Sequence, residues 1–529
     1  MNTKQLKAKI LDLAIHGKLV PQNPDDEPAS KLLEKIREEK AKLIAEKKVK
    51  ADKNDSYIFV GDDKRHYEQM ADGTVKDIED EIPFELPEGW AWCRLGEIFF
   101  HTTGKALKKS NAKGTLRKYI TTSNLYWDSF DFTEVREMYF TDEELEKCTI
   151  KKGDLVLCNG GDVGRAAIWN YDEDICYQNH VSRLRPKSNE INNKLYLYLL
   201  MFYKEQGLLG GKGIGITSLS ANDLLSALFP LPPINEQGKI VAEIERIFTL
   251  IDSLESEKQD LQVAIKQAKS KILDLAIHGK LVPQDSSDEP ASVLLEKLRA
   301  EKEAKIKAGE LKRDKNDSYI YKSTTDNCHY QRFADGTEEP LEITNEIPQN
   351  WTWCSLGEIS TKLKRGKSPT YTEKSSIMAF AQKCNQKEGP TTLEKALYID
   401  ESTLKKYSEE EKMQFNDIVI NSTGTGTLGR VGIFNCKIPD DVVAVYPDSH
   451  VSSVRINPSL FAKYFYYFVK NKQNYLEEMG EGSTNQKELK IDTIANLIVP
   501  LPPLAEQKRI VEKIENAFAK LDFIAEQLA

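Results

Sequence analysis

The stretch IVAEIERIFTLIDSLESEKQDLQVAIKQAKSKILDL, residues 240–275, decides how the rest of the chain is organised. Its apolar residues recur at alternating steps of four and three, which is the spacing of the a and d positions in a left-handed coiled coil. Lys258 interrupts this apolar seam, and it either fixes the register or lies where the partner helix is interrupted. Such a helix would be about 54 Å long, which makes an ordinary core helix the less favoured alternative. The chain must therefore supply a partner helix of similar length.

An internal duplication surrounds this stretch, and its repeated motifs keep the same order in both copies. The matching pairs are KILDLAIHGKLVPQ at 9–22 and 271–284, DEPAS at 26–30 and 288–292, WAWCRLGEI at 90–98 with WTWCSLGEI at 351–359, and PLPPINEQGKIVAEIE at 230–245 with PLPPLAEQKRIVEKIE at 500–515. A repeat of this length marks two copies of one structural unit. The chain therefore contains the same frame twice.

The registers of these repeats identify the missing partner helix. Aligned on PLPP, Ala529 corresponds to Gln259, and aligned on the first repeat, Met1 corresponds to Val263, so that only residues 260–262 lack a counterpart. The two chain ends laid end to end would therefore pair with the central helix, as in a circular molecule cut open inside one helix. The predicted seam consists of Ile240, Ile244, Ile247, Ile251, Leu254, Leu261, Ile265, Ile272 and Leu275 in the centre, Ile510, Ile514, Leu521 and Ile524 at the C-terminus, and Leu6, Ile10 and Leu13 at the N-terminus.

Start and stop signals bound these helices. The proline pairs before Ile234 and Leu504 suit a helix start, and Gly17 and Gly279 suit a helix end with positive φ. A second, charge-rich helix is predicted after Pro28 and after Pro290; it presents either a solvated face or a docking surface for a partner. The expected organisation is a first frame segment (1–80), a first variable domain (81–233), a central frame segment (234–345), a second variable domain (346–503) and a C-terminal helix (504–529).

The two inserts between the repeated motifs diverge from one another. Residues 153–157 and 416–420 read as matched buried strands, and residues 196–203 and 461–469 as a matched aromatic-rich core helix. Gly-rich loops at 210–217 and 480–487 also correspond. The fold class predicted from this pattern is α+β: two α/β domains joined by a pseudo-twofold pair of long antiparallel coiled-coil helices, in a circularly organised duplication.

Local basic runs and polar loops in these inserts indicate DNA contacts. Lysines and arginines gather at 105–118 and 362–367, and the polar loops NGGDVGR (159–165) and NSTGTGTLGR (421–430) follow the predicted strands. Such side chains bind phosphates and read base edges. The candidate DNA-contacting residues are Lys105, Lys108, Lys109, Lys113, Arg117, Lys118, Asn159, Arg165, Asn179, His180 and Lys212 in the first insert, and Lys362, Lys364, Arg365, Lys367, Tyr371, Asn421, Thr423, Arg430, His450, Asn485 and Lys487 in the second.

Other interpretations of these positions exist. A basic run often forms only a solvated face, and the loops contain no GxxxxGK[ST] phosphate-binding motif. His180 and His450 favour structural or DNA-contacting roles, since no cysteine or carboxylate lies beside them at metal-ligand spacing. We find no Walker A, adenine methyltransferase, GxSxG or HExxH motif, so no catalytic residue and no metal site is predicted.

Composition sets the remaining limits. With 529 residues, 40% hydrophobic and 30% charged residues, the chain should form at least two globular domains. No run of about 20 apolar residues occurs, so we expect no membrane span. The N-terminus is amphipathic rather than a signal peptide. Eight cysteines without CxxC spacing indicate a reduced, cytoplasmic protein, and a net charge of −9 allows only local basic surfaces.

The twofold frame of PLPPxxEQxxIVxxI, KILDLAIHGKLVPQ with DEPAS, and WxWCxLGEI before each variable insert resembles the specificity subunits of type I restriction-modification enzymes. The resemblance covers nearly the whole chain. It implies two target recognition domains that each read one half of a split, asymmetric double-stranded DNA sequence. It also implies a subunit without catalysis or cofactor of its own, which recruits two methyltransferase subunits and the restriction subunits. S-adenosylmethionine, ATP and Mg²⁺ are then expected on those partners. The alternative is a non-catalytic coiled-coil DNA-binding scaffold or regulator without methyltransferase partners.

Overall fold

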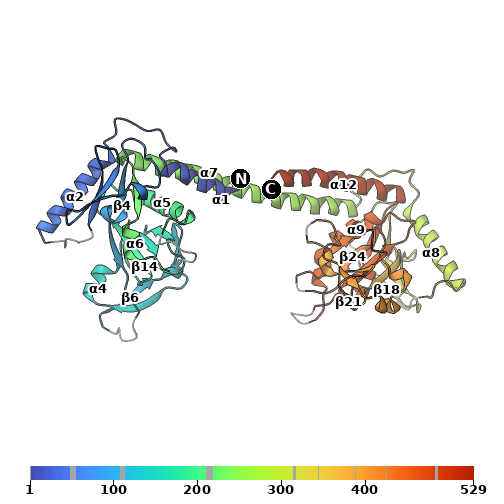
Figure 1. Cartoon of the computed structure of the whole chain (residues 1–529). Coiled ribbons are helices and arrows are strands. Elements are labelled where there is room, and N and C mark those ends of the chain that lie inside the picture. Colours follow the sequence, from blue (N-terminus) through green and yellow to red (C-terminus); the bar gives the residue numbers. More distant parts are fainter. Residues whose placement is uncertain are drawn as a thin grey trace. The chain divides into compact units, whose positions relative to one another are not determined.

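The computed structural model describes residues 2–47, 55–107, 113–209, 218–313, 317–343, 345–387, 389–424, 426–482 and 487–528. The chain divides into two compact units, residues 1–257 (unit 1) and 258–529 (unit 2). Both units mix helices with sheets, which confirms the predicted α+β class (Figure 1). One long helix, α7 (Ile234–Ile277), contributes its first part to unit 1 and its last part to unit 2.

In unit 1, helix α1 (Thr3–Ile15) packs antiparallel to the first part of α7. Lys7 pairs with Asp252 at 2.5 Å and lies over the ring of Phe248, whereas Gln22, beyond the end of α1, reaches back to Glu236 in the first turn of α7. Apolar residues of α1 and α7 join one core cluster with α2 (Ala29–Ala45) and α5 (Asn193–Glu205). This core joins the frame to the recognition domain.

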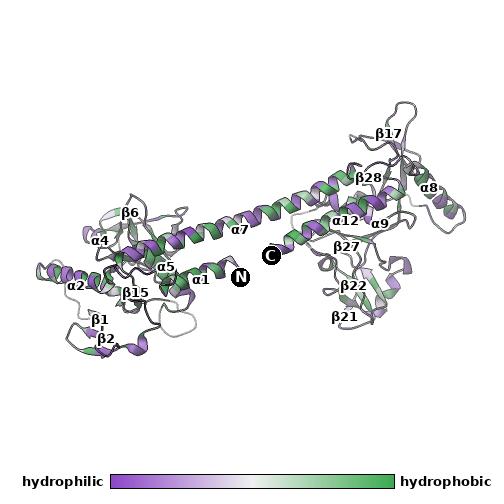
Figure 2. Ribbon diagram, turned by 90° about the horizontal axis from the view of Figure 1, so that it is seen from above, coloured by the Kyte–Doolittle hydropathy of each residue, from purple (hydrophilic) through white to green (hydrophobic). Residues whose placement is uncertain are grey.

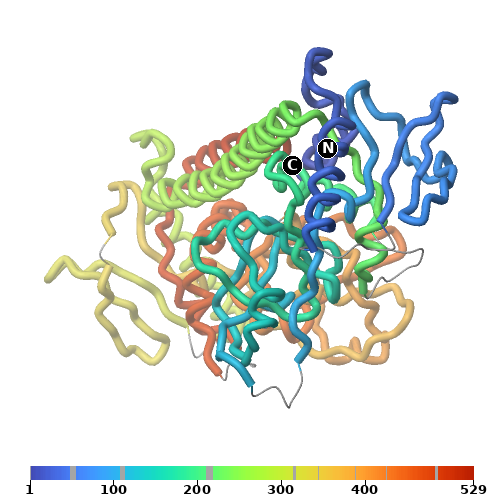
Figure 3. The backbone as a smooth tube through the Cα atoms, turned by 90° about the vertical axis from the view of Figure 1, so that its left-hand side faces the viewer, coloured from blue at the N-terminus to red at the C-terminus, as the bar shows by residue number. Residues whose placement is uncertain are grey.

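In unit 2, helix α12 (Leu504–Gln527) takes the same place beside the last part of α7, as the red and yellow-green tubes of Figure 3 show. Lys269 pairs with Asp522 and lies over the ring of Phe518, which repeats the Lys7 contacts at equivalent positions. Helix α8 (Ala291–Lys307) and helix α9 (Ala462–Asn471) pack into the core of this unit. Each unit therefore pairs one terminal helix with its own part of α7.

The predicted seam is buried only in part. Ile240, Ile244, Ile251, Ile265, Ile10, Ile510 and Ile514 are buried, and Ile247, Ile272, Leu275, Leu6, Leu13 and Leu521 are half-buried. Leu254, Leu261 and Ile524, however, are 61%, 41% and 42% exposed, which corrects the prediction for these three positions. They lie close to the ends of α1 and α12, where the partner helix stops. A straight helix also drifts by about 20° per heptad away from an ideal 3.5-residue repeat.

The recognition domain of unit 1 (described here without residues 108–112 and 210–217) contains two four-stranded sheets. The first has the order β12-β11-β14-β5, with β12 (Ala166–Ile168), β11 (Leu155–Cys158), β14 (Val181–Pro186) and β5 (Phe99–Thr103) antiparallel. The second has the order β10-β13-β6-β9, with β10 (Thr149–Ile150), β13 (Ile175–Tyr177), β6 (Thr115–Ile120) and β9 (Arg136–Phe140); β13 and β6 are parallel. The smaller elements are β4 (Ala91–Arg94) paired with β15 (Leu228–Leu231), β7 (Leu125–Tyr126) paired with β8 (Ser129–Phe130), α3 (Leu95–Ile98), α4 (Asp142–Lys147), α6 (Ala221–Leu225) and the 3-10 turn η2 (Thr122–Asn124).

Unit 2 repeats the first sheet, whereas its second sheet shares three strands with that of unit 1 and has its fourth strand at the other edge. Its first sheet has the order β20-β27-β24-β25, with β20 (Ser360–Arg365), β27 (Val451–Ile456), β24 (Ile418–Asn421) and β25 (Val431–Ile433). Its second sheet has the order β21-β23-β22-β26, with β21 (Tyr371–Thr372), β23 (Leu397–Ile399), β22 (Ile377–Phe380) and β26 (Ala444–Pro447). The smaller elements are β19 (Thr352–Ser355) paired with β28 (Ile498–Leu501), α10 (Gln473–Glu478), α11 (Ile491–Ala495) and the 3-10 turns η3 (Gln382–Cys384), η4 (Glu401–Lys406) and η5 (Glu409–Glu411).

The matched buried strands begin two residues later than predicted, at Leu155 and Ile418. Gly153 and Asn416 instead form a turn, with φ of 90° and 72°. This left-handed conformation suits glycine and asparagine, which explains why those two residues precede the strand in both copies. The aromatic helix is confirmed as core, since Tyr196 and Tyr464 are buried.

A small module is attached to the frame of each unit. Arm 1 (residues 29–82) combines α2 with a sheet of β1 (Ser56–Val60), β2 (His66–Met70) and β3 (Val75–Asp77), followed by the 3-10 turn η1 (Glu79–Glu81). Arm 2 (residues 291–346) combines α8 with β16 (Ser318–Lys322), β17 (His329–Phe333) and β18 (Glu338–Leu341). Both helices begin directly after the predicted prolines, and both carry many hydrophilic residues (Figure 2).

Candidate nucleic-acid interface

One edge of the first sheet gathers the polar loops of unit 1. Cys158, the last residue of β11, lies opposite Val181, the first of β14, and Ser182 lies opposite Thr103, the last of β5. The loop residues that extend these strands, Asn159 and His180, therefore meet at this edge. We call the residues 104–105, 159–164, 178–180 and 218 edge 1; backbone bridges join Lys105 to Gln178 and Gly160 to Ser218.

Within edge 1, Asn159 is partly buried and holds the loop together. Its Nδ2 donates to the Asn179 carbonyl oxygen at 3.2 Å and to Ser182 Oγ at 3.0 Å. His180 is exposed, and Gly160 lies so close to its ring that a Cβ at Gly160 would be 2.8 Å from Nδ1. A side chain at position 160 would therefore displace the His180 ring. His180 thus projects from a loop that the hydrogen bonds of Asn159 hold in place.

The corresponding edge 2 of unit 2 consists of residues 365–368, 422–423, 448–450 and 487–488. Thr423 Oγ1 lies 2.6 Å from His450 Nδ1, and the His450 backbone N–H donates to Asp448 at 2.8 Å. Arg365 donates to the Ser449 carbonyl oxygen at 2.5 Å and forms an ion pair with Glu488. Burial raises the pKa of the Asp448 carboxyl. His450 is therefore exposed but held in one orientation, with Nε2 as the ring nitrogen left for a ligand.

Two predicted DNA contacts are equivalent lysines with a structural role. Lys105 is buried, and its Nζ pairs with Glu144 at 2.6 Å and donates to the Tyr139 carbonyl oxygen at 2.7 Å. Lys367 pairs with Glu411 at 2.8 Å and donates to the Lys406 carbonyl oxygen. Each glutamate belongs to a capping box, with Thr141 or Ser408 as the capping residue. We therefore correct the prediction for Lys105. Lys367 also joins a strand end to a loop, but its side chain is 42% exposed and its DNA contact stays a prediction.

Lys362 is corrected in the same way. It is buried and forms an ion pair with Asp417 at 3.1 Å, and Asp417 also accepts two hydrogen bonds from Arg455, both at 2.8 Å. Burial lowers the pKa of the Lys362 ammonium, which Asp417 opposes. The equivalent carboxylate in unit 1, Asp154, pairs with Arg185, at 2.7 and 2.6 Å, and accepts from the Lys151 backbone N–H at 2.7 Å; among the described residues no lysine ammonium pairs with it.

The arginines of the glycine-rich loops also face inward. Arg165 donates to the Thr122 carbonyl oxygen at 2.6 Å, and Arg430 donates to the Asn385 carbonyl oxygen at 2.9 Å. Thr122 is the first residue of η2, and Asn385 directly follows η3. Asn421 is fully buried and binds Asn385. These three residues fix the loops of edges 1 and 2 rather than present a DNA contact.

The remaining candidates stay predictions. Exposed basic or aromatic side chains are Lys113, Arg117, Lys118, Lys364, Tyr371 and Lys487. Asn179, His180, Arg365, Thr423 and His450 lie at the two edges. Lys108, Lys109, Lys212 and Asn485 lie outside the described residues.

Sequence reasoning missed a set of hydrogen bonds at the start of each long helix, in which one glutamate binds a tryptophan and a glutamine. We call this set a lock. The Glu236 carboxylate accepts from Trp90 Nε1 at 2.9 Å and Gln22 Nε2 at 2.6 Å, and Glu506 accepts from Trp351 and Gln284 at the same two distances. Burial raises the pKa of both carboxyls. The repeated WxWC, VPQ and PLPPxxEQ motifs carried this signal, because each lock draws one residue from each motif.

The described residues contain no group of three histidine, cysteine or acidic side chains that could hold a metal ion. Within the same residues, every helix is too short or too polar to cross a bilayer.

Comparisons with known proteins agree with this architecture. A family model described as the type I restriction modification DNA specificity domain matches residues 87–263 and 348–529. The type I restriction enzyme EcoEI specificity subunit of Escherichia coli is 26% identical, with 99% of this chain and 90% of that relative covered. The EcoAI specificity subunit of Escherichia coli is 25% identical, with 97% and 88% covered.

Solved structures share the fold. The HsdS subunit from Thermoanaerobacter tengcongensis superposes with a TM-score of 0.50 at 17% identity, over 84% of this chain and 93% of that one. A chain from a structure on complex assembly and conformational transition of the type I R-M system gives a TM-score of 0.53 at 18% identity, over 84% and 94%. The matched family model covers most of the chain and both recognition domains, so the chain belongs to the type I restriction-modification DNA specificity family.

Proposed function

We propose that this chain reads a split, asymmetric DNA sequence, with edge 1 contacting one half and edge 2 the other. The observation that carries the proposal is the contrast between two equivalent edges: the loop scaffolds match, but different side chains reach the surface. Gly161 and Asn179 stand in edge 1 where Thr423 and Ser449 stand in edge 2. Two similar domains with different polar surfaces suit two different half-sites.

Exposed basic side chains support contact with the DNA backbone. Lys113, Arg117 and Lys118 in unit 1 and Lys364 and Lys487 in unit 2 are all exposed. Phosphate contacts of this kind give affinity that falls steeply with salt and fix the register of the protein on the duplex. In this proposal α7, paired with α1 and α12 as a pseudo-twofold coiled coil, is the spacer, and half-sites on one face of the DNA would lie about one helical turn, ~34 Å, apart.

The chain itself would catalyse no reaction and bind no cofactor. It would recruit two methyltransferase subunits, which use S-adenosylmethionine to methylate adenine, and restriction subunits, which use ATP and Mg²⁺ to cleave DNA. All eight cysteines are free thiols, which suits the reducing cytoplasm where such a complex would act.

Methylation of DNA by the chain with its methyltransferase partner tests the proposal, and mapping the modified adenines reports the target directly. We expect adenine methylation within one two-part sequence. Exchange of residues 85–228 for the corresponding segment of another specificity subunit should change one half-site and leave the other intact. Absence of sequence-specific methylation would refute the restriction-system role, and a change in both half-sites would refute the modular arrangement.

A further inference from the structure

The residue two positions before the histidine differs between edges 1 and 2. Gln178 and Asp448 occupy equivalent places, because each forms a backbone bridge to the lysine of its edge. The carbonyl oxygen of each also accepts a hydrogen bond from the valine three residues on, at 2.9 and 3.1 Å. His180 and His450 follow at the same spacing. The backbones therefore match, and a carboxylic acid stands in edge 2 where a neutral amide stands in edge 1.

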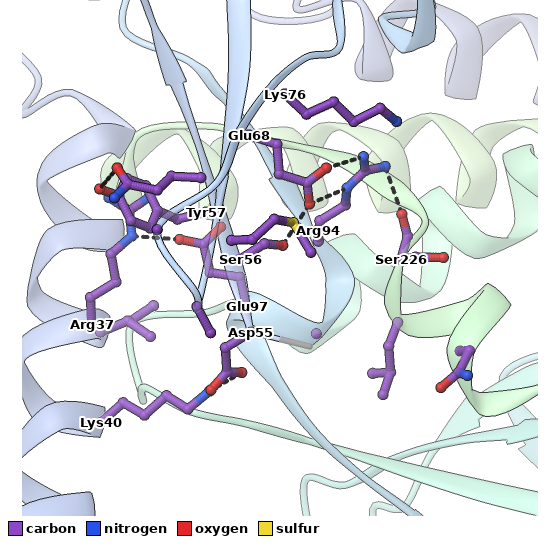
Figure 4. Close-up of a pocket in the computed structure, with 18 of the residues that line it drawn as sticks. Arg37, Lys40, Asp55, Ser56, Tyr57, Glu68, Lys76, Arg94, Glu97 and Ser226 are labelled. Atoms are coloured by element: carbon purple, nitrogen blue, oxygen red, sulfur yellow. Dashed lines mark hydrogen bonds and ion pairs between the residues drawn. The ribbon is translucent and has the colours of Figure 1, made fainter. Parts of the chain in front are cut away.

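Asp448 is a buried carboxylate without an ion-pair partner. It is 3% exposed. The other buried carboxylates of the described residues either pair with a lysine or an arginine or accept two side-chain N–H donors in the locks. Figure 4 shows one such pair, Glu97 with Arg37, beside the cavity of about 830 Å³ between α2 and the sheet of arm 1. Within the same residues, the Asp448 carboxylate accepts one hydrogen bond, from the His450 backbone N–H at 2.8 Å, and forms no ion pair.

The basic side chains of edge 2 do not neutralise this carboxylate. Arg365 pairs with Glu488, and Lys367 pairs with Glu411 at 2.8 Å. Lys487 is exposed, where it suits a contact to a DNA phosphate. The counter-charge of the buried acid must therefore come from another group when solvent is removed.

The groups around Asp448 leave one residue type to supply it. Burial raises the pKa of the Asp448 carboxyl, whereas the backbone N–H it binds and the charges of the neighbouring histidine and arginine lower it. Tyr371, Cys384 and Tyr407 also interact with this charge. Burial raises the pKa of all three, to about 11 for Cys384 and to about 12 for Tyr407, so they stay neutral between pH 6 and 8. Histidine is the side chain whose charge ordinarily changes in that range.

His450 is placed to carry the charge. Its side chain is exposed, and its Nδ1 lies 2.6 Å from the Thr423 hydroxyl oxygen, which can accept from a protonated ring. In an imidazolium both ring nitrogens donate, so Nδ1–H would bind Thr423 and Nε2–H would point to a ligand. His180 has no carboxylate at the equivalent place, and the acid of its edge, Asp162, is bound by two basic side chains.

Bound DNA would increase the need for this charge. A duplex removes water from the edge and brings phosphates close to it, and both effects disfavour a carboxylate without a counter-charge. Protonation of His450 offsets both effects, because the imidazolium interacts favourably with Asp448 and with the DNA. Edge 1 has no such requirement, since Gln178 is uncharged.

We propose that His450 binds DNA as an imidazolium supported by Asp448, so that recognition of the half-site read by unit 2 takes up a proton. The Nε2–H group then donates to an electron-rich acceptor of the DNA, either guanine N7 in the major groove or a phosphate oxygen. The inference rests on the proposed function and adds a chemical difference between the two half-sites, because edge 1 binds without this proton.

DNA affinity measured against pH tests the proposal. The full chain, with its methyltransferase partner, is titrated with DNA that carries both mapped half-sites, at pH 6, 7 and 8 and constant ionic strength. A coupled proton changes Kd by up to about tenfold per pH unit, and we expect about tenfold weaker binding at pH 8 than at pH 6. Scrambling the half-site of unit 2 should remove this dependence, and scrambling the half-site of unit 1 should leave it.

Three substitutions isolate the pair. Asp448→Asn keeps the oxygen that accepts the backbone N–H but removes the charge, and His450→Gln removes the group that takes up the proton. Both should change in affinity by less than about twofold between pH 6 and 8. The reciprocal Gln178→Asp should give the half-site of unit 1 the same pH dependence. His329→Gln, in strand β17 of arm 2, is the control and should keep the wild-type profile. Thermal unfolding checks that each variant folds.

Modified DNA identifies the acceptor. If 7-deazaguanine in the half-site of unit 2 removes the pH dependence, the acceptor is guanine N7; if the dependence stays, it is a phosphate oxygen. Sequence-specific binding with equal affinity at pH 6 and 8 would overturn the proposal, as would a wild-type profile in Asp448→Asn. Absence of sequence-specific binding at every pH would instead refute the proposed function.

Discussion

Unit 1 and unit 2 agree in the frame and differ at the DNA-reading edge. The lock at the start of α7 and the lock at the start of α12 have the same residues at the same distances: Trp90 and Trp351 each lie 2.9 Å from the glutamate they bind. At the edges, Gly161 stands where unit 2 has Thr423, so His450 has a hydroxyl partner on its ring and His180 does not. The hydrogen bonds that hold each frame are therefore repeated in both units. The side chains at edges 1 and 2, which we propose to distinguish two DNA half-sites, are not.

A second level of agreement lies beneath the divergent surfaces. Lys105 and Lys367 both bind the glutamate of a capping box, and Arg165 and Arg430 both donate to a carbonyl of the neighbouring sheet. The charged cluster at the base of the first sheet is the exception, since Asp417 binds both Lys362 and Arg455 while Asp154 binds Arg185. Substitutions can therefore be chosen in equivalent pairs.

The largest effect is expected at this cluster. Asp417→Ala would leave Lys362 buried without its carboxylate, and loss of one partner of a buried ion pair costs about 3–5 kcal/mol. Asp154→Ala leaves only the half-buried Arg185 and should cost less, about 2 kcal/mol. Thermal unfolding of the two variants measures the difference. Lys362→Met in the Asp417→Ala chain should restore part of the stability; equal costs in both units would contradict the assigned role of Lys362.

The buried carboxyl at the base of each arm gives a pH-dependent difference. Burial raises the pKa of Glu97 from 4.5 to about 7, although Arg37, Lys187 and Lys40 act against the shift, and burial raises the pKa of Glu358 as well. Because the folded state keeps this proton longer than the unfolded state, Glu97 contributes stability that is present below pH 4.5 and is lost as the pH rises through 7.

Glu97→Gln should therefore flatten this part of the stability curve. The expected difference between wild type and variant across pH 4.5–7 is up to about 3 kcal/mol, from 1.36 kcal/mol for each pKa unit. Denaturation midpoints measured at several pH values check it, and Glu358→Gln should change the profile in the same direction. A wild-type profile that runs parallel to that of the variant would show that Glu97 titrates normally.

The frame was the part of the structure that the sequence predicted best. The heptad spacing identified α7, and the repeat registers placed α1 and α12 against it, because long repeats leave little freedom of alignment. The three exposed seam positions, Leu254, Leu261 and Ile524, could not be found from spacing alone, since exposure there depends on where the partner helices end.

The candidate site was harder to predict, for a physical reason. A lysine in a basic run looks the same in sequence whether it binds phosphate or an internal glutamate. Lys105 and Lys367 each follow a glycine whose Cβ would meet a backbone carbonyl oxygen, at 2.3 and 2.1 Å. The recurring Gly-Lys pair was the available signal, but two residues are too few to align divergent domains. The partners, Glu144 and Glu411, lie about 40 residues further along the chain and are brought near only by folding.

The locks should respond equally in the two units. Trp90→Phe and Trp351→Phe each remove one donor from a buried carboxylate, and such charged hydrogen bonds contribute about 1.5–3 kcal/mol. We expect a cost of about 2 kcal/mol in either unit, read from thermal unfolding of the full chain. Phenylalanine keeps one aromatic ring but is smaller than the indole, so lost packing contributes to the cost in both units. Costs that differ by more than about 1 kcal/mol would mean that the two frames are not equivalent.

The smallest effect is expected where the edges differ most. Thr423→Val keeps the shape of the side chain but removes the hydroxyl from His450, so the ring can turn and must be ordered again on binding. One hydrogen bond of about 0.5–1.5 kcal/mol corresponds to roughly two- to twelvefold weaker DNA binding. The loss should appear only for the half-site read by unit 2, in binding assays with each half-site altered in turn. The reciprocal substitution, Gly161→Thr, would strain unit 1, because Gly161 has a φ of 70° that a β-branched residue rarely adopts. His180→Ala is therefore the matched variant, and it should weaken only the other half-site; a Thr423→Val chain that loses affinity for both half-sites would mean that His450 does not act within one edge.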